Sequence, residues 1–283
     1  MIPFGSPYNS TPISPTDSLD LGGPLTLSVT PLLDAVPIGA PVRIKLELKN
    51  NSDSPIAVPE SLSLKSEHVT GAVSDGSQAK RSFRSIFRCI EEHSLGVLKP
   101  GASILADMTL LRGLEGALFP GPGLHGVDVR LDWEIDGIGV GVTGSASVMI
   151  TPPVDDDHAA TAKHTLSAPD LLLTVAVGGD HLYEGNAALD AAMSNKTLAP
   201  HYAVIEAKRL GRHFARRKAN PEAALKCLGS NPVVSASEAE KVAEIIADAP
   251  PEALKSAPKK LAAKFKTASQ SRAVKKFVDC IDA

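Results

Sequence analysis

Apolar and polar residues alternate with a period of two over the first half of the chain, as they do in half-buried β-strands. In residues 42–49, four aliphatic side chains alternate with four charged ones. Residues 25–31 alternate in the same way, and the turn-forming sequence NNSDSP follows the 42–49 segment. Many short strands separated by regular turns predict an antiparallel β-sandwich. Further short apolar segments lie at 56–64, 69–73, 83–90 and 104–111.

Two longer alternating segments, 127–136 and 138–150, flank the dipeptide Asp136-Gly137. Asp-Gly favours the two-residue type I′ turn of a β-hairpin. With this turn the register places apolar residues opposite one another, which is the arrangement that stabilises a strand pair. The cross-strand pairs predicted in this way are Ile135 with Ile138, Trp133 with Val140, and Leu131 with Val142.

The same segment contains a G-x-G-x-x-G motif, formed by Gly139, Gly141 and Gly144. A dinucleotide-binding motif requires these glycines between a strand and the N-terminus of a helix. Here a second strand and a proline stop follow, and the predicted register puts Gly139 and Gly141 on the polar face, opposite Glu134 and Asp132. The motif is therefore predicted to be structural, and no nucleotide or other cofactor is expected.

The sequences LKPGAS (98–103) and LFPGPGLHGVDV (118–129) resemble the turns that lead into late strands of bacterial immunoglobulin-like domains. In that family a PG-x-Tyr corner commonly precedes an alternating strand, and in this chain Leu124 or His125 occupies the Tyr position. The resemblance covers residues 25–153. It implies an immunoglobulin-like fold and carries no implication for an activity.

The periodicity changes to that of helices after the Pro pair and charge run of TPPVDDDH. The sequence thus predicts two domains, of β and α class: an antiparallel immunoglobulin-like sandwich followed by an all-α helical bundle. The predicted divisions are an irregular Pro/Ser-rich arm (1–24), the sandwich (25–153), a linker (154–166) and the helical domain (167–283). The predicted helices lie at about 171–177, 181–194, 200–218, 221–228, 236–249 and 258–281.

The two parts of the chain differ in net charge, although the net charge of the whole chain is only −3. Residues 1–158 carry 11 basic and 19 acidic side chains, whereas residues 159–283 carry 18 basic and 13 acidic ones. The sequence shows no secretion signal and no apolar run long enough to span a bilayer. The three cysteines lack C-x-x-C spacing, as expected for reduced thiols in a cytoplasmic protein.

A basic helical face in residues 200–218 is the main candidate for an interaction surface. Spacings of four residues bring its cationic side chains together on a helix. The face is predicted to meet an anionic partner, with contact to the acidic first domain as the alternative; nucleic acid is not favoured, because stacking aromatic residues are lacking. The residues of this face are Lys208, Arg209, Arg212, His213, Arg216 and Arg217.

Carboxylates and imidazoles cluster near the predicted linker and are the candidates for a metal site. Their two histidines are six residues apart and cannot form the i, i+4 pair of H-E-x-x-H zinc sites, so no metal site is predicted. His181 with Glu184, and His201 with Glu206, are candidates for acid–base chemistry without a supporting motif. The metal candidates are Asp155, Asp157, His158 and His164.

These observations favour a non-enzymatic protein–protein interaction or scaffold protein that uses sandwich loops or edges and the basic helical face. A hydrolase or metal-dependent enzyme with a site at the interdomain cleft is the alternative. A second alternative is a protease inhibitor that presents a sandwich loop such as FPGPGLHG. The sequence does not specify the partner or the oligomeric state.

Overall fold

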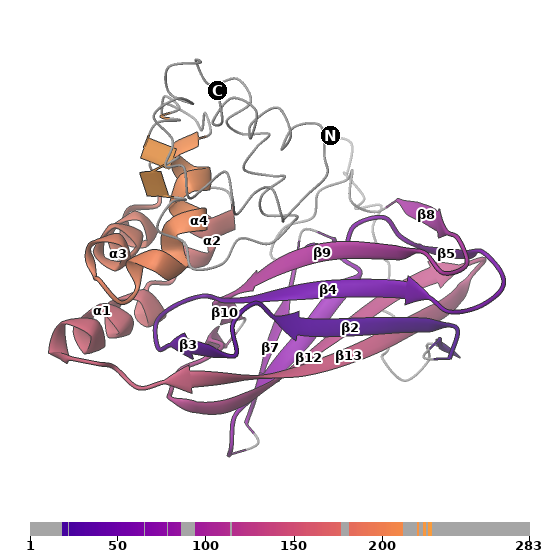
Figure 1. Cartoon of the computed structure of the whole chain (residues 1–283), viewed down its shortest axis with the longest axis horizontal. Helices are drawn as coiled ribbons and strands as arrows, with labels where there is room; N and C mark the ends of the chain where they lie inside the picture. Colours follow the sequence, from indigo (N-terminus) through magenta and orange to yellow (C-terminus); the bar gives the residue numbers. More distant parts are fainter. Residues whose placement is uncertain are drawn as a thin grey trace, which may run out of the picture.

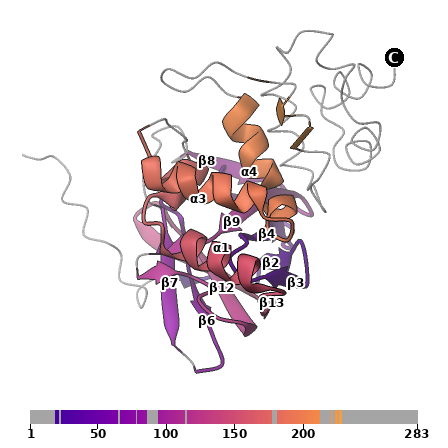
Figure 2. The ribbon, with the colours of Figure 1, turned by 90° about the vertical axis from the view of Figure 1, so that its left-hand side faces the viewer.

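The structure is a computed structural model of the chain, and it places two layers of β-sheet beside a group of helices (Figure 1). It describes residues 19–211 except 22, 65, 78, 86–93, 114 and 177–180, together with 220, 223, 224, 226 and 227. The helices gather at the end of the sandwich where β3 and β10 lie, and Figure 2 shows this end facing the viewer. The predicted helices at 236–249 and 258–281 lie outside the described residues, as does half of the one at 221–228.

One layer is a six-stranded sheet with the order β1-β13-β12-β6-β7, and β3 pairs with β13 at one end. All pairings are antiparallel except those of β1 and β3 with β13, which are parallel. Residues 19 and 20 belong to the predicted irregular arm, yet they form strand β1, which pairs with Val140 and Gly141 of the long strand β13. The strands are β1 (Leu19–Asp20), β3 (Ala35–Pro37), β6 (Val69–Ser74), β7 (Lys80–Arg84), β12 (Gly123–Ile135) and β13 (Ile138–Thr151).

The facing layer is the antiparallel sheet β2-β4-β9, accompanied by two short antiparallel strand pairs. Strands β2 and β4 cover the segments predicted at 25–31 and 42–49, and their alternate aliphatic side chains are buried, as the pattern predicts. The strands are β2 (Leu25–Pro31), β4 (Val42–Asn50) and β9 (Ser103–Leu110), with β5 (Ile56–Pro59) paired to β8 (Leu95–Leu98) and β10 (Arg112–Gly113) to β11 (Gly116–Ala117).

The β12–β13 hairpin confirms the predicted register at all three cross-strand pairs. Asp136 and Gly137 form the turn with φ angles of 50° and 80°, so both are left-handed, as a type I′ turn requires. The glycines of the G-x-G-x-x-G motif lie within β13 and not at a helix N-terminus. The motif is part of a hairpin.

The glycines of β13 allow close packing on both faces of the strand. A Cβ atom at Gly144 would lie 2.3 Å from the carbonyl oxygen of Leu27, so this glycine brings the two sheets together. Gly141 is predicted on a polar face, where an exposed position is expected, but it is buried under the Arg130–Asp132 ion pair and beside β1. A Cβ atom there would lie 2.8 Å from Asp132 Oδ1.

Four helices follow the sandwich in the described residues. The predictions at 171–177, 181–194 and 200–218 correspond to α2, α3 and α4, the last of which is described as far as residue 211. Most of the segment predicted as a linker, 154–166, is helix α1. Its acidic run caps the N-terminus of this helix and does not form a loop. The helices are α1 (Asp156–Ser167), α2 (Leu171–Ala176), α3 (Tyr183–Ser194) and α4 (Ala199–Gly211).

The helices join the sandwich through a buried polar contact at the turn before β4. His158 of α1 donates from Nε2 to the carbonyl oxygen of Ile38 at 2.9 Å. The hydroxyl of Tyr202 in α4 donates to the carbonyl oxygen of Gly39 at 2.7 Å, and Thr165 Oγ1 lies 3.2 Å from the same oxygen. The surrounding apolar residues of strands and helices form one continuous buried cluster. The division into two domains therefore stays a prediction.

We expect Gly137→Val to lower the free energy of unfolding by about 1–3 kcal/mol, because a β-branched residue is strained at positive φ. Gly137→Asn is the control, since Asn tolerates the left-handed region and should cost less. Urea unfolding followed by circular dichroism measures both values. Equal costs for the two variants would contradict the type I′ turn.

Gly39→Ala should separate helix α1 from the sandwich. Gly39 has a φ of 85°, and a Cβ atom there would lie 2.6 Å from Ala162 Cα, a backbone atom that cannot move independently of the helix. We expect a loss of at least about 3 kcal/mol in urea unfolding, from backbone strain together with steric overlap. Gly76→Ala, where a Cβ atom would meet no atom within 4 Å, should change stability by less than about 0.5 kcal/mol.

The stability of the protein should fall as the pH drops from 6.5 towards 4. Partial burial lowers the pKa of His201 from 6.5 to about 4, with contributions from the nearby charge of Arg43 and from electrostatic repulsion between the imidazoles of His201 and His158 when both are protonated. The unfolded chain therefore takes up a proton in this window that the folded protein does not, and folding is penalised as the pH falls. His201→Gln should reduce this dependence, measured as the difference in urea midpoint between pH 7.5 and pH 5. An unchanged difference would contradict the role of His201.

Candidate functional site

The carboxylates and histidines that are the metal candidates lie at the N-cap of helix α1 or within the helix. Asp155 is its N-cap, and its Oδ1 accepts a hydrogen bond from the backbone N–H of His158 at 2.7 Å. Asp157 Oδ2 accepts from Asn195 Nδ2 at 2.7 Å, which ties α1 to the end of α3. His164 is exposed near the last turn of the helix. Within the described residues, no three His, Cys, Asp or Glu side chains are placed to hold a metal ion.

Both ring nitrogens of His158 have protein partners. The backbone N–H of Val154 donates to Nδ1 at 3.1 Å, so this nitrogen carries no proton. Nε2 then carries the ring proton and donates it to Ile38. The buried ring is thus a structural connection between the α1 N-terminus and the sandwich, and its lone pair is unavailable to a metal.

The described part of the basic helical face takes part in contacts among the helices. Arg209 donates from Nε and Nη2 to both carboxylate oxygens of Glu206, at 2.5 and 2.6 Å, and from Nη2 to Asp190 of α3 at 3.0 Å. Burial alone lowers the pKa of Arg209, but these two carboxylates raise it above its ordinary value. Lys208 is half-buried. The other members of the face, Arg212, His213, Arg216 and Arg217, lie outside the described residues.

This arrangement also accounts for one of the acid–base candidates. Both oxygens of Glu206 accept hydrogen bonds from Arg209, and the carboxylate is only 7% exposed. Glu206 is thus a structural anion that holds Arg209, which in turn links α4 to Asp190 of α3, while His201 lies near Arg43 and His158. The structure thus assigns Glu206 and His201 to different contacts.

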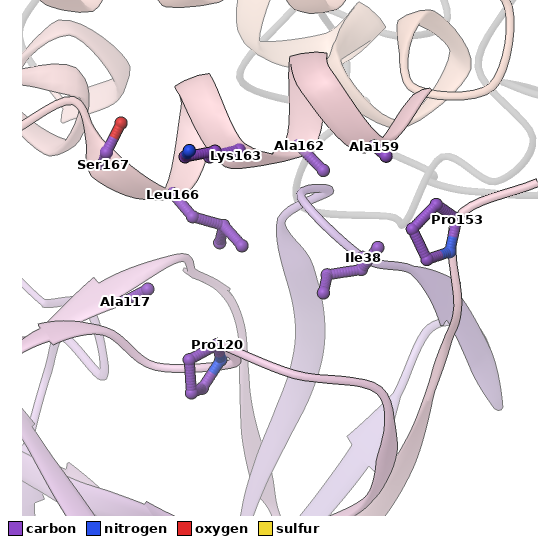
Figure 3. Close-up of a pocket in the computed structure, with 9 residues that line it drawn as sticks. All are labelled: Ile38, Ala117, Pro120, Pro153, Ala159, Ala162, Lys163, Leu166 and Ser167. Atoms are coloured by element: carbon purple, nitrogen blue, oxygen red, sulfur yellow. The ribbon is translucent and has the colours of Figure 1, made fainter. Parts of the chain in front are cut away.

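An apolar pocket opens between helix α1 and the end of the sandwich, with a volume of about 400 Å³ (Figure 3). Leu166 projects from the helix towards the sandwich, where Ile38 and Pro120 lie across from it. Three further helix residues, Ala159, Ala162 and Lys163, line the same space, with Ser167 at the end of the helix and Ala117 and Pro153 on the sandwich side. We call this the α1–sandwich pocket.

The Ser167 hydroxyl at the pocket wall and the nearby Arg112 guanidinium both donate to backbone carbonyl groups. Arg112 Nη1 donates to the carbonyl oxygen of Leu166 at 2.8 Å, and the Ser167 hydroxyl donates to the carbonyl oxygen of His164 at 3.1 Å. The Ser167 hydroxyl is therefore directed to a backbone acceptor rather than to an imidazole that would activate it as a nucleophile. The surface left for a ligand is apolar, with the exposed Lys163 beside it.

A second pocket, of about 410 Å³, lies between the C-terminal end of α1 and helix α3. Its lining is more polar and includes the side chains of His164, Tyr183 and Glu184, and Ser167 borders it as well as the α1–sandwich pocket. Tyr183 is 78% exposed, an unusual state for a large aromatic side chain. We call this the α1–α3 pocket.

A third hollow borders the loop 120–125, part of the segment considered as an inhibitor loop. The loop is braced from inside, because His125 lies 2.9 Å from the Gly121 carbonyl oxygen through Nε2 and contacts Phe119 edge-to-face. His125 Nδ1 has no hydrogen-bond partner among the described residues, but it is buried away from solvent and so is closed to a ligand. The loop is held rigidly, and its polar side chain faces inward.

Sequence reasoning missed the pockets because they join segments that are far apart in the chain. The helix side of the α1–sandwich pocket could have been recognised from the sequence. Ala159, Ala162 and Leu166 repeat at helical spacing within the segment interpreted as a linker. The sandwich side comes from three separate turns, which no local pattern connects.

Comparisons with known proteins find similarity to solved structures over about half of the chain. The sequence matches no family model and no curated protein. A CARDB domain from Pyrococcus furiosus is 8% identical, with a TM-score of 0.24, over 45% of this chain and 94% of that one. The sporulation control protein Spo0M of Bacillus subtilis is 15% identical, with a TM-score of 0.28, over 50% of this chain and 54% of its own. A DNA-bound alkylpurine DNA glycosylase of Pseudomonas fluorescens is 15% identical, with a TM-score of 0.27, over 45% of this chain and 30% of its own.

At these identities and TM-scores the similarity carries no argument about superfamily or function, so the immunoglobulin-like resemblance stays a prediction. The structure itself shows two facing β-sheets, as a sandwich requires. Among the helices of the described residues, none is both long and apolar enough to cross a membrane.

Proposed function

We propose that the protein is a non-enzymatic interaction module that binds a segment of a partner protein across the C-terminal half of helix α1. The proposal is carried by one observation: two open pockets, one apolar and one more polar, share Ser167 as a common border. Neighbouring hollows divided by one residue can accept successive side chains of a single extended chain.

The α1–sandwich pocket supplies the apolar anchor point. Its walls are formed by a helix and by three separate segments at the end of the sandwich, so it is largely formed before a ligand arrives. Removing apolar surface from water contributes about 25 cal/mol per Å². A single large aliphatic or aromatic side chain of a partner would therefore provide much of the binding free energy.

The α1–α3 pocket supplies the directional contacts. Tyr183 presents a large rigid ring with a hydroxyl group, the kind of side chain that dominates the energetics of many interfaces. His164 and Glu184 add hydrogen-bonding groups around it. An apolar anchor beside a polar, aromatic site is the usual composition of a specific protein interface.

Filling the α1–sandwich pocket should abolish binding without unfolding the protein. Peptides selected from a displayed random library on the full chain serve as ligands, and their affinities are measured by calorimetry. We expect Ala159→Leu to weaken binding at least about tenfold, or ~1.4 kcal/mol, because Leu is a good helix former that occupies the pocket. Tyr183→Ala should weaken binding by a similar factor.

Ala160→Leu is the matched control, because Ala160 is on the same helix but is exposed and does not line the pocket. Its affinity should stay within about twofold of the parent value, and all variants should melt within a few degrees of one another. Selected peptides that bind Ala159→Leu as tightly as the parent, or a library that yields no binding peptide, would contradict the proposal.

A further inference from the structure

Lys163 is the only charged residue among those that line the α1–sandwich pocket. It is exposed and lies beside Leu166 and Ser167 along the helix (Figure 3). The residues three and four positions away on α1 are Ala159, Ala160, Leu166 and Ser167, so the helix itself offers this ammonium no carboxylate.

The other polar side chain among the described lining residues is Ser167, whose hydroxyl donates to the carbonyl oxygen of His164. Arg112 is not a lining residue, and its Nη1 donates to the carbonyl oxygen of Leu166. What the pocket presents to a ligand is therefore an apolar surface with one cationic donor at its edge. A ligand complementary to that surface pairs an apolar group with an adjacent negative charge.

We infer that the α1–sandwich pocket selects a partner segment in which an acidic side chain adjoins the apolar anchor. The inference rests on the proposed function, whose partner it specifies. The apolar side chain enters between Leu166 and Ile38, and the carboxylate meets the ammonium of Lys163. Because Lys163 is exposed, the charge contributes selectivity more than affinity, and the contribution decreases with salt.

The test uses three capped tetrapeptides, Gly-Asp-Leu-Gly, Gly-Asn-Leu-Gly and Gly-Lys-Leu-Gly, with blocked ends so that only the second side chain differs. Binding to the full chain is followed through the methyl NMR signals of Leu166 and Ile38, which also detect weak ligands. At low salt we expect the Asp peptide to bind about three- to fivefold more tightly than the Asn peptide, and the Lys peptide to bind most weakly. The difference should shrink at high salt.

Charge variants decide whether Lys163 is responsible. Lys163→Gln should remove the preference for Asp, and Lys163→Glu should reverse the order of the three peptides. Lys99→Glu is the control, because it makes the same charge change at an exposed position in the turn between β8 and β9. It should leave the order unchanged.

The outcomes separate the two proposals. Peptides that shift the pocket signals with equal affinity, whatever their charge, overturn the inference and leave the proposed interaction site standing. A preference for Asp that persists in Lys163→Gln also overturns it. If none of the peptides shifts these signals, while Ala159→Leu likewise fails to affect library-selected peptides, both proposals fail.

Discussion

Two backbone carbonyl groups, those of Ile38 and Gly39, hold the helices on the end of the sandwich. They are buried at the turn between β3 and β4, and the strand pairings of the described residues do not include them. His158, Thr165 and Tyr202 reach them from two helices that are far along the chain. A buried carbonyl without a partner costs about 1–3 kcal/mol, so the turn and the helices stabilise each other.

This attachment determines which side of α1 faces outward. His158, Ala162 and Thr165 lie on one stripe of the helix and contact the turn, because residues at spacings of three, four and seven share a face. The adjacent stripe carries Ala159 and Leu166, and it faces the loops near Pro120. The α1–sandwich pocket is thus a consequence of attaching a rigid helix by one stripe while its neighbouring stripe stays uncovered by the described residues.

Local patterns predicted the parts of the fold that local forces determine. The turn residues Asp136 and Gly137 and the alternation around them are enough to specify the β12–β13 register, because side-chain period and turn type act over a few residues. The attachment of α1 was not predictable in this way. A run of carboxylates is equally consistent with a solvated linker and with a helix N-cap, and the choice between them depends on His158 finding a carbonyl group 120 residues earlier.

The distribution of charge along the chain was also not sufficient to predict how its two parts contact each other. The excess of acidic residues in the first half and of basic residues in the second suggested attraction between the two parts, yet the described contact is made by hydrogen bonds to backbone carbonyls and by apolar packing. Arg209 belongs to the predicted basic helical face, but its charge is paired with Glu206 and Asp190 within the helical group.

A cation within a charged run has acidic neighbours nearby and is readily paired inside the protein. Lys163 stands instead among alanine, leucine and serine, so its helix cannot neutralise it, and it lies beside an apolar pocket. The proposed binding site rests on this combination of one cation and an uncovered apolar surface. In this protein, the combination is found at the C-terminal half of α1.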